Sequence, residues 1–109
     1  MKSPHQKHPE NKLKTITRDS VLKSIQEFDH IGRKKFLEKY SYGSAKAYWL
    51  VYEYRSYDSK AIIGVARKYV RPGSRPLKCS EFSGGKATVQ RKLENLGITV
   101  WVGRNDYLK

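Results

Sequence analysis

The chain has 109 residues and a formal net charge of +13, from 23 Lys and Arg against 10 Asp and Glu. This length allows one domain of ordinary size, and the single cysteine excludes an intramolecular disulfide or a cysteine-rich zinc site. No apolar stretch approaches the roughly 20 residues that cross a bilayer, and the first residues lack the apolar core of a signal peptide. We therefore expect a soluble, cytoplasmic protein that binds no membrane.

The charge indicates a polyanionic partner. Nucleic acid is the first candidate, and an acidic protein surface or an anionic membrane is the second. Eight tyrosines and two tryptophans exceed what a small core needs, and some of these rings could stack on bases.

Residues 1–16 are polar, contain Pro4 and Pro9, and show no apolar period. This composition predicts a disordered basic arm, which either lies along a phosphate backbone or is a loose tail. Its two histidines lack further ligands, so no metal site is expected. The folded domain is expected to span residues 17–109.

Two helices are predicted at the start of the domain. Apolar residues recur at helical spacing in Val21, Leu22, Ile25 and Phe28. They predict a helix over 19–30, which Thr17 or Asp19 can cap. Gly32 breaks this helix, and a second short helix is expected over 32–40.

The middle of the chain predicts a strand followed by a buried helix. Residues 48–54 are aromatic and β-branched, which is typical of a strand. Arg55-Ser56 is expected to form the turn, and Tyr57 a short return strand. Asp58 or Ser59 then caps a third helix over 59–69, which is the most apolar helix.

The last third begins with a basic, proline-containing loop over 67–78 and one helical turn over 79–82. A fourth helix is predicted over 84–96, with Ser83 as its cap and Gly97 just past its end. A second strand is predicted over 98–102. The expected fold is therefore a single small α+β domain, about four helices on a small antiparallel sheet, which could resemble a winged helix.

The segment Ser83-Gly84-Gly85-Lys86 is a candidate anion site. Two glycines after a capping serine leave backbone N–H groups uncovered at a helix start, and Lys86 adds a full positive charge. A phosphate group fits this arrangement. The alternative is that the glycines allow a close packing contact.

Lys60 follows the predicted cap Asp58-Ser59 and would project from the first helical turn toward a phosphate. Asp58-Ser59-Lys60 also matches an Asp-x-Lys fragment of metal-dependent nucleases. Such a site needs a further acid beside it, and none stands at a recognisable spacing. Capping is therefore the favoured interpretation.

Two further basic surfaces complete the candidate interface. Lys86, Gln90 and Arg91 share the outer face of the fourth helix, where Gln and Arg can read base edges. Arg67, Arg71 and Arg75 lie in the basic loop and suit phosphate contacts. In each case the alternative is an ordinary solvated surface. No catalytic residue, metal or cofactor is predicted.

The stretch Val21 to Ile98 resembles the small N-terminal head domain of McrA-like, modification-dependent (type IV) HNH restriction endonucleases. The motifs that carry the resemblance are Ile25-Gln26-Glu27-Phe28-Asp29, Phe36-Leu37-Glu38-Lys39-Tyr40, Tyr48-Trp49-Leu50-Val51, Tyr57-Asp58-Ser59-Lys60-Ala61-Ile62-Ile63-Gly64-Val65-Ala66, Phe82-Ser83-Gly84-Gly85 and Leu93-Glu94-Asn95-Leu96-Gly97-Ile98. The resemblance implies an accessory DNA-binding α+β module. The chain is too short to hold the HNH, sulfur-binding and base-flipping modules of that family, so cleavage is not implied.

Two functions follow from these observations. The first is a non-enzymatic module that binds nucleic acid, with double-stranded DNA as the expected partner, mainly through phosphate contacts. The alternative is a small protein encoded by a phage or mobile element, which binds and inhibits a host defence or nucleic-acid enzyme. A third possibility, a small nuclease that uses Asp58 and Lys60, is the weakest.

Overall fold

A computed structural model describes residues 12–104 of the chain. Helices and an antiparallel sheet form one α+β domain, as the sequence predicts. The elements in chain order are α2 (Arg18–Ile31), α3 (Arg33–Tyr40), β1 (Tyr48–Tyr52), β2 (Arg55–Asp58), α4 (Ser59–Ala66), η1 (Arg67–Tyr69), η2 (Cys79–Glu81), η3 (Lys86–Gln90), α5 (Arg91–Asn95) and β3 (Thr99–Val102).

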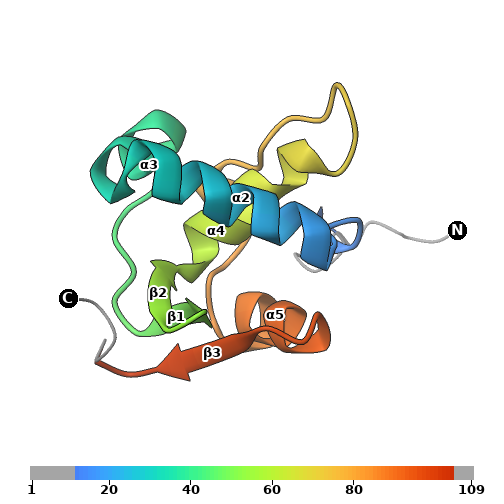
Figure 1. Cartoon of the computed structure of the whole chain (residues 1–109). Coiled ribbons are helices and arrows are strands. Elements are labelled where there is room, and N and C mark those ends of the chain that lie inside the picture. Colours follow the sequence, from blue (N-terminus) through green and yellow to red (C-terminus); the bar gives the residue numbers. More distant parts are fainter. Residues whose placement is uncertain (1–11, 105–109) are drawn as a thin grey trace, which may run out of the picture.

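Helix α4 lies at the centre of the domain, between α2 and the sheet (Figure 1). Every residue of α4 except Lys60 is buried, which confirms the prediction that this is the most buried helix. The Ser24 hydroxyl donates a 2.8 Å hydrogen bond to the Ile62 carbonyl and so joins α2 to α4. A Cβ atom at Gly64 would lie 1.9 Å from the Tyr42 hydroxyl, so this position requires glycine.

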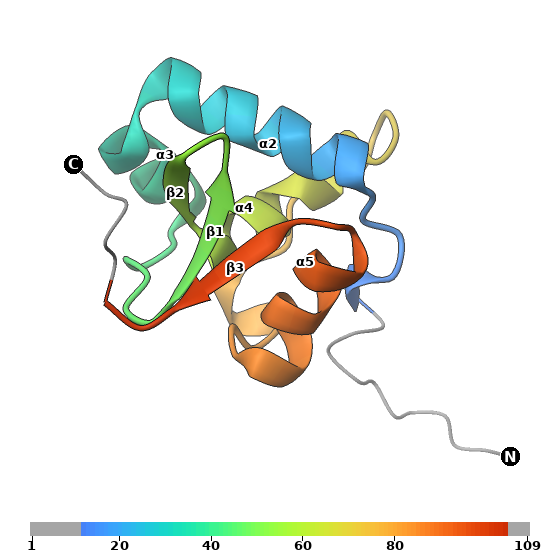
Figure 2. The same ribbon diagram turned by 60° about the horizontal axis from the view of Figure 1, so that its bottom comes forward.

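The three strands are ordered β2-β1-β3 and are antiparallel, and the sheet is seen in front of α4 in Figure 2. Leu50 lies in the central strand opposite Tyr57 and Val100, and its side chain is fully buried in the core. The sheet therefore contributes one apolar face to the same core that surrounds α4.

The predicted turn after the first strand is wrong by two residues. Strand β1 ends at Tyr52, and the turn is made by Glu53 and Tyr54, with φ angles of 50° and 66°. Positive φ at both central residues fits the mirror-image turns that match the twist of a hairpin. Arg55, predicted to turn, is instead the first residue of β2.

The start of the domain confirms one prediction and corrects another. The Thr17 hydroxyl accepts a hydrogen bond from the Ser20 amide and caps α2, as predicted. However, Leu13 and Ile16 are buried in the core, so the packed part of the chain begins before residue 17. The rest of the predicted basic arm, residues 1–11, lies outside the described residues.

The predicted third and fourth helices are both shorter than expected. Helix α4 ends at Ala66 and is followed by the 3-10 turn η1. The predicted fourth helix begins two residues late, at Lys86, with a π-helical turn, and becomes an α-helix at Arg91. A winged-helix arrangement is not formed, because the β1–β2 hairpin precedes α4 and a single strand of the described chain follows α5.

Candidate nucleic-acid interface

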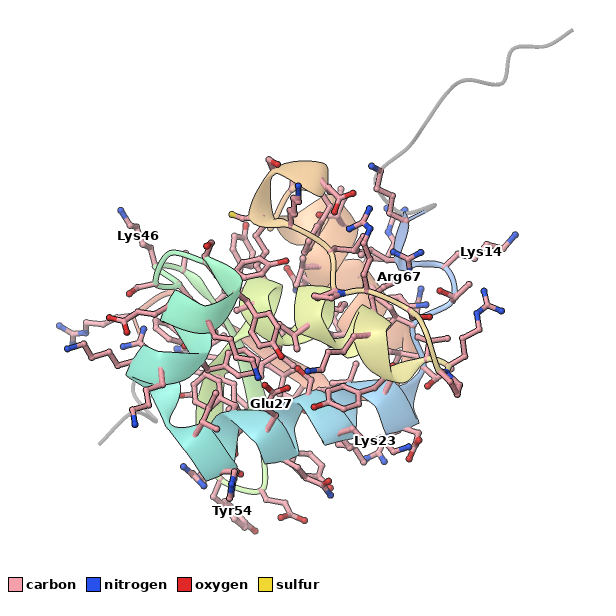
Figure 3. The ribbon with its side chains drawn as sticks, turned by 90° about the horizontal axis from the view of Figure 1, so that it is seen from above. Lys14, Lys23, Glu27, Lys46, Tyr54 and Arg67 are labelled. Carbon is pink, nitrogen blue, oxygen red and sulfur yellow. The ribbon has the colours of Figure 1, made fainter. Side chains whose placement is uncertain are left out.

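Glu27 lies at the centre of a cluster of two lysines and two tyrosines. Its carboxylate accepts hydrogen bonds from Lys39 Nζ at 2.8 Å, Tyr40 Oη at 2.7 Å and Tyr69 Oη at 2.7 Å, and Lys68 Nζ lies 3.2 Å away. Figure 3 shows Glu27 beside η1, near the middle of α2. Burial raises the pKa of Glu27, but these hydrogen bonds outweigh burial and lower it from 4.5 to about 2. Two lysines are thus paired with this carboxylate.

Asp58 does not cap α4, which corrects the prediction for this residue. Its side chain is 2% exposed and accepts two 2.8 Å hydrogen bonds from the Arg33 guanidinium and a third from the Ala45 amide. Ser59 does not cap the helix either, since its hydroxyl donates to the Tyr48 carbonyl. A bidentate pair of hydrogen bonds from Arg33 stabilises a buried carboxylate more than a hydrogen bond from one backbone amide does.

Lys60 does not project toward solvent as predicted. Its ammonium group donates a 2.7 Å hydrogen bond to the Cys79 carbonyl and lies 5.1 Å from the centre of the Phe82 ring. Its stem packs against Gly84, where a Cβ atom would approach within 2.9 Å. This close approach at Gly84 is of the kind that we considered as the alternative, and the Lys60 ammonium group has an internal partner.

These positions also remove the support for a metal-dependent nuclease site. Asp58 is bound to Arg33, and Lys60 is bound to a backbone carbonyl. Within residues 12–104 there is no group of three or more His, Cys, Asp and Glu side chains that could hold a metal ion.

Two other predicted contact residues have internal partners. Arg75 donates two 2.8 Å hydrogen bonds to Glu81. Glu81 lies just beyond the basic loop that is predicted over 67–78. The hydrogen bond from Arg75 is the main reason that the pKa of Glu81 falls to about 2. Gln90 donates to Glu94 at 3.0 Å, so its amide is held along α5.

A set of cations has no hydrogen bond or ion pair through its side chain in the described part of the chain. The set includes Lys14, Arg18, Lys34, Lys35, Lys46, Arg67, Arg71, Lys86 and Arg91. The structure thus divides the predicted residues: Lys60 and Arg75 have internal partners, whereas Arg67, Arg71, Lys86 and Arg91 have none among residues 12–104.

Four of these cations come from segments at the same end of the molecule. Lys14 and Arg18 precede and begin α2, Arg67 begins η1, and Arg71 follows it; η1 packs against α2. Figure 3 shows Lys14 and Arg67 on the same side of the molecule. The nearby Asp19 is paired with Lys23 at 3.3 Å. We call Lys14, Arg18, Arg67 and Arg71 the basic end.

Lys86 and Arg91 form a second exposed basic surface on η3 and α5. Gly85 precedes this surface, and no atom lies within 4 Å of the position a Cβ would take there. Close packing therefore does not explain this glycine. The predicted cap is also absent, because the Ser83 hydroxyl lies 3.2 Å from the Thr88 hydroxyl and bonds no amide of the first turn.

Arg18 is not among the predicted contact residues, and Lys14 lies in the segment predicted to be a disordered arm. The helical period that predicts α2 also shows that Arg18 is at its start. No local signal, however, shows that this end of α2 lies beside η1, because their contact depends on how both pack against α4.

The comparisons with known proteins identify the class of the domain. Residues 14–102 match the family described as ScoMcrA-like, N-terminal head domain, and the chain belongs to this family. No curated protein matches the sequence. In residues 12–104 there is no helix long and apolar enough to cross a membrane.

One solved structure of this family is similar to the chain over most of its length. It is the type IV phosphorothioation-dependent restriction endonuclease ScoMcrA, with 33% sequence identity and a TM-score of 0.58. The match covers 83% of the present chain and 13% of that enzyme. The chain is thus similar to one small domain of a much larger protein, and the matching family is defined by the head domain.

Proposed function

We propose that the chain is a non-enzymatic DNA-binding module, which binds double-stranded DNA mainly through phosphate contacts of the basic end. The observation that carries the proposal is the set of free cations at that end: Lys14, Arg18, Arg67 and Arg71 face no unpaired carboxylate among the described residues. Membership in a head-domain family of restriction endonucleases supports DNA as the polyanion.

Lys86 and Arg91 extend the proposed surface along η3 and α5. The segment 12–16 connects the two regions, because Lys92 Nζ donates a 3.4 Å hydrogen bond to the Lys14 carbonyl. In this proposal Arg91 contacts phosphate rather than base edges, since its neighbour Gln90 is bound to Glu94. Binding then depends weakly on sequence and strongly on salt.

The test compares two double variants that lose the same charge. Arg67→Ala/Arg71→Ala removes two cations of the basic end, and Lys34→Ala/Lys35→Ala removes two free cations of α3. Affinity for a duplex of about 20 base pairs is measured at several salt concentrations. We expect the first variant to bind at least about tenfold more weakly. The slope of its log affinity against log salt concentration should decrease by the equivalent of roughly two phosphate contacts. The second should bind nearly as well as the unchanged protein.

Equal losses in the two variants would show that net charge, and not the basic end, drives binding. A salt-independent affinity would reject phosphate contacts altogether. Incubation of the duplex with the protein and Mg²⁺ tests the non-enzymatic part of the proposal, because strand cleavage would contradict it.

A further inference from the structure

The two edges of the sheet differ in how well they are covered. Strand β2 forms one edge, and its residues Ser56, Tyr57 and Asp58 are at most 7% exposed. Strand β3 forms the other edge, where Val102 is 50% exposed and Thr99 is also exposed. In Figure 1, β3 lies at the lower rim of the molecule, with no described element beyond it. The β2 edge is therefore buried, and the β3 edge is exposed.

The register of the sheet shows which backbone groups of β3 face outward. Gly103 donates a 2.8 Å hydrogen bond to the Ala47 carbonyl, and Trp101 and Thr99 follow at two-residue intervals opposite Trp49 and Val51. In an antiparallel ladder, hydrogen-bonded pairs alternate with pairs whose N–H and C=O groups point away. Val100 and Val102 are such alternate residues, so their backbone donors and acceptors point to the open edge.

Strand β3 is short, with four residues, but it lacks the other features that protect an exposed edge. Besides short length, soluble proteins protect such strands with a lysine, a proline, a bulge or a covering segment. The sequence Thr99-Val100-Trp101-Val102 contains no charge and no proline, and its register with β1 is continuous. An unprotected edge of this kind is a template for the addition of a further strand.

We propose that the β3 edge binds an extended, acidic segment of a partner protein as an added strand. Charge determines the choice of occupant. Lys46 lies on the loop that adjoins the end of the strand, and the whole chain carries +13. A second copy of the chain would bring the same charge to this edge and be repelled. DNA is disfavoured because it lacks the alternating N–H and C=O groups that pair with the backbone of an edge strand.

The proposal is independent of DNA binding, since β3 holds none of the residues of the basic end. It goes beyond the proposed function by giving the module a second surface of different chemistry. A module with both surfaces can hold DNA and a protein at the same time.

The test uses the full chain, labelled with ¹⁵N, and a synthetic peptide of sequence EETVTVTVEE. We expect the peptide to slow hydrogen exchange at the Val100 and Val102 amides and to leave the core amides of α4 unchanged. A peptide in which lysines replace the four glutamates should bind at least about fivefold more weakly at low salt, because its charge repels the protein.

Two variants separate strand addition from a side-chain contact. Val102→Pro removes one outward N–H and leaves the β1–β3 ladder intact, since proline is tolerated where the N–H of an edge strand faces solvent. Val102→Ala retains the N–H and removes most of the side chain. We expect Val102→Pro to bind the acidic peptide at least about fivefold more weakly than Val102→Ala, because one hydrogen bond is lost. Both variants should have similar thermal melting curves.

Three results would overturn the proposal. The acidic peptide could give no protection of Val100 and Val102, even at millimolar concentration. Val102→Pro could bind as tightly as Val102→Ala. The free protein could sediment as a dimer whose interface protects the same two amides, which would assign the edge to a second copy.

Discussion

Where α2 meets α3 and β2, four lysines and arginines are bound to carboxylates, whereas the four cations of the basic end are not. Glu27, Asp29 and Asp58 form ion pairs with Lys39, Lys68, Arg55 and Arg33. At the basic end, Lys14, Arg18, Arg67 and Arg71 have no such partner among the described residues. The sequence is rich in bases throughout, so the placement of its few acids determines which bases can bind a ligand.

The largest effect is expected from removal of the buried acid in the paired region. Asp58→Ala leaves the Arg33 guanidinium, which is 34% exposed, without its carboxylate. We expect the free energy of unfolding to fall by about 3 kcal/mol in urea titrations, because breaking a buried ion pair leaves a charge without a partner. Asp19→Ala is the control. Asp19 pairs with Lys23, and the two side chains are 76% and 51% exposed, so the loss should be much smaller. Equal losses would mean that burial does not distinguish the two acids.

Glu27→Gln should cost about 2 kcal/mol at pH 7, less than Asp58→Ala because Lys39 is half exposed. The pKa of Glu27 is lowered from 4.5 to about 2 in the folded protein. Its charge therefore stabilises the fold above pH 4.5, and this contribution is lost as the pH falls toward 2. Urea titrations of both proteins at pH 7, 4.5 and 2.5 should show the difference shrinking. A difference that stays constant with pH would contradict the assignment.

The next effect tests the surface that begins at Gly85. Gly85→Glu places an acid beside Lys86, in a position with open space and a φ of −95°. We expect DNA affinity to fall about fivefold through charge repulsion, with an unchanged melting temperature. Gly85→Gln has the same shape without the charge and should bind DNA nearly normally. A lowered melting temperature in both variants would instead indicate a packing role for this glycine.

The smallest effect is a gain of affinity, produced by converting a paired cation into a free one. Glu81→Gln removes the charge that holds Arg75 but retains an oxygen for the Lys78 amide, which donates to Glu81 at 2.7 Å. We expect DNA affinity to rise about threefold. The slope of log affinity against log salt concentration should increase by the equivalent of at most about one phosphate contact. Titrations of duplex DNA with Glu81→Gln and with the unchanged protein at two salt concentrations provide the measurement. Unchanged affinity would place Arg75 outside the interface.

Most of the fold could be predicted from local patterns. The helical period identified α2 and α4, the aromatic run identified β1, and Gly97, with a φ of 77°, ends the fourth helix as expected. Two errors arose where the local signal was weak. Leu13 and Ile16 lie in a polar segment without a period, and the turn at Glu53-Tyr54 contains no glycine or asparagine to mark it.

The candidate site was only partly predictable, because the partner of a charged side chain depends on the packing of the whole domain. Asp58 and Arg33 are 25 residues apart in the sequence, and Lys60 and Cys79 are 19 apart. Local rules assigned Asp58 to a helix cap and Lys60 to solvent. Charge composition predicted a basic surface, but it could not show which of its residues the acids would occupy.

We expect the turn at Glu53-Tyr54 to affect the order in which the domain folds. Two consecutive non-glycine residues in the left-handed region make this hairpin costly to close in isolation. Its strand β1 is completed by β3, which pairs with it across about fifty residues of sequence. The helices can therefore pack together early, and the sheet is completed when β3 pairs with β1. During synthesis, residues Thr99–Val102 emerge from the ribosome after the rest of the domain. Until they emerge, apolar β1 and the surface of α4 beneath it would be exposed.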